Sequence, residues 1–120
     1  MKAGSHRPHQ VAETVRHVLA EALVREVRDP RVGMVTLTEV TVTGDLGHAK
    51  IKFVAGGEAE ASETALEGLR SAAGFLRTKV ARALGTRVVP ELHFEVDRGR
   101  EHAARINEVL ASLQREESGD

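Results

Sequence analysis

Cysteine, tryptophan and tyrosine are absent from the 120-residue chain, and its only aromatic residues are three phenylalanines. Without cysteine the protein has neither disulfides nor a thiolate metal site, which is compatible with a reducing cytosol. No apolar run approaches the about 20 residues that a membrane-spanning helix needs, and the opening MKAGSHRPHQ contains no hydrophobic segment of a secretory signal. We therefore expect one soluble, cytoplasmic domain with a hydrophobic core and no membrane partner.

Neither sign of charge dominates, since the formal net charge is −1, but the two signs are separated along the chain. The stretch GEAEASETALEG contains four glutamates and no basic residue. Residues 70–87 contain no acidic residue and five basic ones, which are Arg70, Arg77, Lys79, Arg82 and Arg87. The net charge argues against a nucleic-acid partner for the chain as a whole, while the local basic block favours one.

The hydrophobic pattern predicts a single domain over 8–114, between flexible tails at 1–7 and 115–120. Helical spacing extends from 8 to about 28 and returns near the C-terminus, where Ile106, Val109, Leu110 and Leu113 share one face. Alternating or β-branched residues predict strands at 35–43, 48–55 and about 88–97, with GDLG as the turn between the first two. Leu37 and Val40 are three residues apart, which indicates a β-bulge near Glu39.

The stretch LRSAAGFLRTKVARAL has helical spacing but contains Ala72, Ala73 and Gly74 at its centre. Glycine inside a helix costs about 1 kcal/mol relative to alanine. Packing at a helix crossing, capping of one helix and a functional kink would each explain it. Because the basic block flanks this glycine, we favour a functional kink that also packs, between one helix before it and a second that ends at Gly85. The predicted fold class is α+β.

Four motifs in order resemble the ribosome-binding factor A family: RDPR, VTLTEVTVTGDLGHAKIKFV, LRSAAGFLRTKVARAL and PELHFEVD. The resemblance extends from Pro8 to Leu113. It implies a type II KH-like domain of order α-β-β-α-kink-α-β-α, in which an Ala-x-Gly kink at residues 72–74 replaces the Gly-x-x-Gly loop. Gly44 to Gly47 formally match Gly-x-x-Gly, but a turn between strands cannot serve as a phosphate clamp between helices.

The same resemblance implies a non-enzymatic factor that binds the immature 30S subunit and its 16S ribosomal RNA. Such factors assist late maturation, including 5′-end processing, particularly in the cold, and leave before translation with the help of an assembly GTPase. The sequence departs from the family at Gly44, where serine is common, and at Arg98 and Gly99, where a capping hydroxyl is often seen. We expect a monomer that needs no cofactor.

No recognisable catalytic or metal-binding constellation appears in the sequence. His93 alternates with Glu91 and Glu95 on a predicted strand, and a solvated polar face explains this pattern better than a metal site. We expect no catalytic residue and no metal ligand.

The residues favour RNA binding through the backbone and shape of the RNA, since all three phenylalanines have core-like positions and none is free to stack on bases. The predicted RNA-binding set joins the basic block and the kink to four further cations: Arg70, Ala72, Ala73, Gly74, Arg77, Lys79, Arg82, Arg87, Arg28, Arg31, Lys50 and Lys52. The alternative is a KH-like adaptor that binds a protein or a different RNA, with its acidic helix face as the docking surface.

Overall fold

The computed structural model describes residues 3–57 and 60–118. Its elements, in chain order, are the helix α1 (Ala3–Arg25), the 3-10 turn η1 (Pro30–Val32), the strands β1 (Val35–Val42) and β2 (His48–Ala55), the helix α2 (Ala61–Leu84), the strand β3 (Glu91–Val96) and the helix α3 (Arg98–Ser118). This arrangement confirms the predicted α+β class, with its three-stranded sheet. The expected domain limits at 8 and 114 stay a prediction.

The sheet has the order β1-β2-β3, with β1 antiparallel and β3 parallel to β2. Successive strand residues point to opposite faces, so Ala49, Ile51 and Phe53 are buried while Lys50 remains exposed. The strand β3 alternates in the same way, which confirms both predicted patterns. One face of the sheet therefore carries the core, and the other meets solvent.

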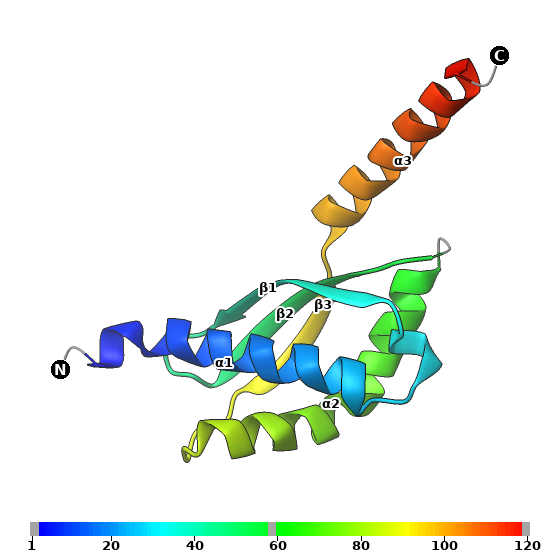
Figure 1. Cartoon of the computed structure of the whole chain (residues 1–120). Coiled ribbons are helices and arrows are strands. Elements are labelled where there is room, and N and C mark those ends of the chain that lie inside the picture. Colours follow the sequence, from blue (N-terminus) through cyan, green and yellow to red (C-terminus); the bar gives the residue numbers. More distant parts are fainter. Residues whose placement is uncertain (1–2, 58–59, 119–120) are drawn as a thin grey trace.

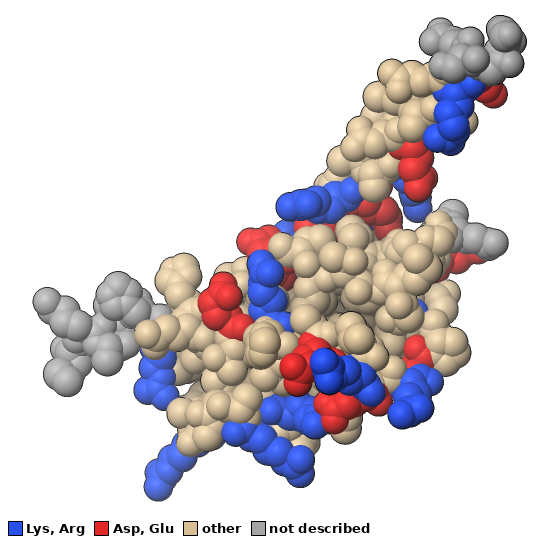
Figure 2. Space-filling model, viewed as in Figure 1, with Lys and Arg blue, Asp and Glu red and all other residues tan. Residues whose placement is uncertain are grey.

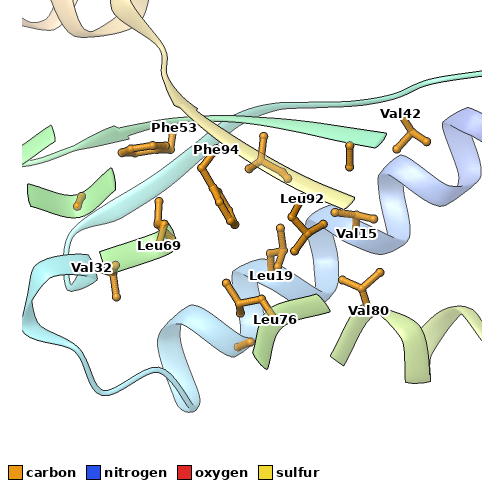
Figure 3. Packing of buried hydrophobic residues seen from close by; sticks show 14 of the residues in the cluster. Val15, Leu19, Val32, Val42, Phe53, Leu69, Leu76, Val80, Leu92 and Phe94 are labelled. Atoms are coloured by element: carbon orange, nitrogen blue, oxygen red, sulfur yellow. The ribbon is translucent and has the colours of Figure 1, made fainter. Parts of the chain in front are cut away.

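Helices α1 and α2 cover the apolar face of the sheet (Figure 1). Figure 3 shows Leu19 of α1 and Leu76 of α2 directed towards Phe94 of β3, and Leu19 and Leu76 have no exposed surface. Burial of a side chain of this size contributes about 1.5–3 kcal/mol. The layer of helices on one side of a small sheet thus forms a single core.

A β-bulge interrupts the pairing of β1 with β2 between Leu37 and Glu39, as the sequence predicts. Thr38 is the extra residue, because Leu37 pairs with Phe53 while Glu39 pairs with Lys52. The Thr38 hydroxyl donates a hydrogen bond to Asp97 Oδ2 at 2.6 Å. The bulge therefore connects the edge strand to the start of α3.

The helix boundaries differ from the predicted ones at several places, including the end of α3 at Ser118, inside the tail predicted at 115–120. α1 begins at Ala3, five residues before the predicted start, so that Pro8 lies inside the helix. The sequence also predicts two helices around Gly74, whereas the backbone forms a single helix α2 that runs through this residue. Figure 1 shows that α2 changes direction along its length, although it is one continuous helix from Ala61 to Leu84. Gly85, with φ of 62°, ends α2 in the left-handed conformation, as predicted.

Helix α3 points away from the sheet and the other helices, which makes the molecule 64 Å long (Figure 1). Its predicted apolar side is present but exposed: Ile106, Val109, Leu110 and Leu113 retain 47–58% of their surface. At its base, Glu101 accepts a hydrogen bond from the Ser62 hydroxyl, and Arg98 Nη2 lies 2.5 Å from Glu63 Oε1. These contacts attach the first turn of α3 to the first turn of α2.

The close packing against a glycine of α2 occurs at Gly68 and not at Gly74. RDPR forms the turn η1, in which the Asp29 carboxylate accepts from the Arg31 backbone N–H and from its guanidinium. α2 packs on this turn at Gly68, where a Cβ atom would lie 2.9 Å from Val32 Cγ1 and 3.0 Å from Arg31 Cβ. The glycine is therefore required by packing, although nothing in its sequence neighbourhood distinguishes it.

Replacing Gly68 with alanine should destabilise the fold. Inserting a methyl group into a filled contact typically costs about 1–3 kcal/mol, and the helix-propensity gain of about 1 kcal/mol offsets only part of it. From the middle of these ranges we expect a net loss of about 1 kcal/mol in the free energy of unfolding, measured by urea denaturation. Unchanged or increased stability would show that η1 does not press on α2 as described.

Asp97 begins α3, because its Oδ1 accepts from the Arg100 backbone N–H at 3.1 Å. This carboxylate takes the place of the hydroxyl cap that is missing at Arg98 and Gly99. The hydrogen bond from Thr38, and then that from Arg100, lower the pKa of Asp97 below its ordinary value of 3.8. Since the folded state holds the charged form, this group stabilises the fold above pH 3.8, and the contribution disappears as the pH falls through the lowered pKa.

The Thr38→Val variant tests this connection. It should have a lower free energy of unfolding than the original chain at neutral pH, because Asp97 loses a hydrogen bond to its charged form. Urea denaturation from pH 7 down to about 2.5 should show this difference shrinking below the ordinary Asp range. A constant difference across that range would contradict the link between Thr38 and the charged Asp97.

Candidate nucleic-acid interface

Four exposed residues follow one another at four-residue spacing along the outer side of α2, namely Arg70, Gly74, Thr78 and Arg82. Residues four apart are neighbours on a helix surface, so they form one continuous line, with Arg77 beside it. We call these five residues the basic face of α2. Arg70 and Arg82 lie at the two ends of this line, and Gly74, which has no side chain, lies between them.

The backbone of α2 is exposed to solvent at Gly74, where no side chain covers it. A Cβ atom placed on it would meet nothing within 4 Å, so no neighbouring element requires glycine there. This overturns the packing half of our interpretation of Gly74. The Thr78 hydroxyl donates to the Gly74 carbonyl at 3.1 Å, and bonds of this kind often bend helices. Ala72 and Ala73 point inward and pack against the core, so of the three predicted kink residues only Gly74 is fully exposed.

The five cations of the sequence block differ in their partners. Arg77 donates to the carbonyl oxygens of Val89 and Pro90, at 2.9 and 3.3 Å. Lys79 Nζ lies 2.6 Å from Oε1 of Glu26, which directly follows α1. The remaining three have no hydrogen bond or ion pair with any residue in the described part of the chain, and these are Arg70, Arg82 and Arg87. These three cations remain available to an anionic partner.

The four additional predicted cations do not all lie on this surface. Lys50 and Lys52 are on the solvent side of the sheet, opposite the face that α2 covers, and Lys52 lies 3.9 Å from Glu39. Arg31 is held by Asp29, whose pKa it lowers through their side-chain hydrogen bonds. Arg28 is exposed and has no partner among residues 3–57 and 60–118. The structure thus separates the two lysines from the basic face of α2.

Phe75 is exposed, although the sequence predicts a position in the core. It does not lie in the core: 47% of its surface is exposed, next to Gly74 on α2. The Lys79 ammonium group lies 5.8 Å from the centre of its ring, within the range of a cation–π contact. An aromatic ring is therefore available beside the basic face of α2, whereas Phe53 and Phe94 are buried as predicted.

Basic side chains gather on the molecular surface over the second part of α2, along the lower edge of Figure 2. Acidic side chains are interspersed with them nearer α1, which agrees with the ion pair between Lys79 and Glu26. Sequence spacing could not reveal this pairing, because Glu26 lies at the end of α1, more than 50 residues before Lys79 in the chain. The described residues contain no helix long and apolar enough to cross a membrane.

Comparisons with known proteins identify the family. The sequence model described as "Ribosome-binding factor A" matches residues 7–110. This chain belongs to the ribosome-binding factor A family. It is 45% identical over 115 residues to the factor of Rhodopirellula baltica, covering 96% of this chain and 84% of that protein. It is 44% identical over 116 residues to the factor of Thermomicrobium roseum, covering 97% of this chain and 90% of that one.

Solved structures of the family share the fold. The crystal structure of ribosome-binding factor A from Thermus thermophilus has a TM-score of 0.66 at 26% identity, over 76% of this chain and 97% of its own length. A homology model of the Thermus thermophilus factor, fitted into an electron cryo-microscopy map of its complex with the 30S subunit, has a TM-score of 0.62 at 28% identity. It covers 77% of this chain and 96% of that one.

Proposed function

We propose that this chain binds the immature 30S ribosomal subunit through its 16S ribosomal RNA, and that the basic face of α2 makes the main contact. Membership of the ribosome-binding factor A family supports the partner, as does the fitted complex of the Thermus thermophilus relative. The site is inferred mainly from Arg70 and Arg82, which lie on either side of the exposed backbone of Gly74 and have no partner among residues 3–57 and 60–118.

The chemistry of this surface suits an RNA backbone. Arginine guanidinium groups bind phosphate oxygens through charged, paired hydrogen bonds. The absence of a side chain at Gly74 lets a phosphate or ribose approach the helix closely between the two arginines. Exposed Phe75 adds a ring that can contact a base. Contacts of this kind recognise the path of the RNA strand more than its sequence.

In this proposal the protein assists late maturation, including processing of the 5′ end of the 16S RNA, by preferential binding. A factor that binds one conformation of a maturing RNA more tightly shifts the population towards it, by as much as its affinities differ. No catalytic residue and no cofactor is required for this action. The factor acts as a monomer and leaves before translation, with an assembly GTPase assisting its release.

Sedimentation of cell extracts tests the proposal. The tagged chain should co-sediment with free 30S subunits and their precursors and should be absent from 70S ribosomes. Its loss should enrich 16S RNA with an unprocessed 5′ end. Equal binding to both particles, or to neither, would contradict it. Association that survives nuclease treatment, with a partner other than the 30S subunit, would favour the adaptor alternative.

A further inference from the structure

Two histidines and a glutamate meet on the solvent face of the sheet, away from α2. β2 begins at His48 and β3 begins at Glu91, and the parallel register pairs these two residues. His93 is two residues further along β3 and so points to the same face. One ring nitrogen of each histidine and a carboxylate oxygen of Glu91 all lie within 4.8 Å of one another.

The two histidine rings already have a separation close to that of metal ligands. His48 Nδ1 and His93 Nε2 are 3.0 Å apart, and the ring centres are 5.1 Å apart. Zinc bonds nitrogen at about 2.0–2.1 Å, so two nitrogen ligands on a tetrahedral ion are about 3.4 Å apart. An opening of about 0.4 Å would therefore bring both nitrogens to bonding distance of one ion.

The backbone at His48 and at Glu91 is held in place by hydrogen bonds before any ligand arrives. The Thr43 hydroxyl accepts from the His48 N–H at 3.1 Å, and the Gly47 carbonyl accepts from the Glu91 N–H at 2.9 Å. Sites on regular strands are positioned more accurately than sites on loops. Asp45 Oδ1 accepts a hydrogen bond from the Gly47 N–H at 2.9 Å, so its negative charge lies in the turn directly before His48.

We propose that His48, Glu91 and His93 form a binding site for a divalent transition metal, with zinc as the best match. Two imidazoles and one carboxylate are a ligand set that zinc, nickel and cobalt accept, whereas calcium and magnesium prefer oxygen alone. Three protein ligands on an exposed face leave the remaining coordination positions to water. The site is also bordered by Lys50 and Thr43, around a depression of about 420 Å³.

The sequence alone pointed to a different set here. The Glu91, His93 and Glu95 spacing was best explained by a solvated face, and Glu95 is not part of the cluster. His48 completes it through strand pairing across 45 positions of sequence. Only the parallel alignment of β2 with β3 brings the two histidines together.

Isothermal titration calorimetry of the full chain with zinc chloride tests the site. His6 and His9 near the N-terminus could bind zinc independently, so every protein carries His6→Gln and His9→Gln. We expect one equivalent of zinc to bind, and His48→Gln or His93→Gln to weaken binding at least about tenfold. The matched control, His102→Gln on α3, should leave affinity unchanged.

Cobalt supplies a second readout. The original site should give a visible absorption band from a low-coordinate cobalt ion with nitrogen ligands, and both histidine variants should lose it. Glu91→Gln should change the band and weaken zinc binding. Absence of saturable zinc binding, or equal affinity in the His48 and His93 variants and the control, would overturn the proposal.

Discussion

The double variant Arg70→Glu with Arg82→Glu should bind the 30S precursor roughly 100-fold more weakly than the original chain at moderate salt, if each arginine neutralises a phosphate. Both side chains are exposed and make no hydrogen bond or ion pair within the described residues. Their replacement should therefore change the free energy of unfolding by no more than about 0.5 kcal/mol each. Arg77 is a poorer target, since its bonds to the Val89 and Pro90 carbonyls support the fold.

A salt series distinguishes phosphate contact from a general effect of charge. Each lost phosphate contact should reduce the slope of log affinity against log salt by roughly 0.7–0.9. The matched control, Lys50→Glu with Arg115→Glu, makes the same change in net charge on the outer sheet face and on α3. It should keep affinity within a few-fold of the original. Equal weakening in both pairs would contradict a specific role for the basic face of α2.

Enlarging Gly74 should separate binding from stability. No atom lies within 4 Å of a Cβ at this position, so Gly74→Ala should raise the free energy of unfolding by about 0.5–1 kcal/mol. Gly74→Val should leave stability within about 0.5 kcal/mol, because valine and glycine both have low helix propensity. Its branched side chain should nevertheless block close approach of the RNA and weaken 30S binding by about tenfold, or about 1.4 kcal/mol.

Gly68 supplies the matched control for this prediction. The same Gly→Ala change should destabilise the fold at Gly68, where a Cβ meets Val32, and stabilise it at Gly74. If Gly74→Val binds the 30S subunit as tightly as the original chain, the RNA does not approach the helix backbone at Gly74. A loss of stability there would show instead that the bend in α2 depends on glycine.

Strands were predictable from sequence because their alternation is local. Ile51 and Phe53 alternate with lysines, and the irregular spacing of Leu37 and Val40 was enough to find the bulge at Thr38. Helical spacing likewise placed most of α1 and α2. The break predicted at Gly74 was wrong, because α2 continues as one helix from Ala61 to Leu84.

The remaining errors concern contacts between residues far apart in sequence. Gly68 and Gly74 both lie in the same helical pattern, and only the position of η1 shows which of them is packed. Lys79 belongs to a block without acidic residues, yet Glu26, just after α1, pairs with it. The hydrophobic character of Phe75 indicated burial, but its place on α2 leaves it exposed. Tertiary packing determines the surroundings of Gly68, Lys79 and Phe75, and the neighbouring sequence does not indicate them.

Crosslinking in growing cells tests the central claim most directly. Ultraviolet irradiation, isolation of the chain with its bound RNA, and mass spectrometry of the crosslinked peptides would identify both partners in the contact. We expect crosslinks to 16S ribosomal RNA at peptides from residues 70–87, and their loss in the Arg70→Glu, Arg82→Glu variant. Crosslinks confined to other parts of the chain, or to RNA other than 16S, would contradict the account.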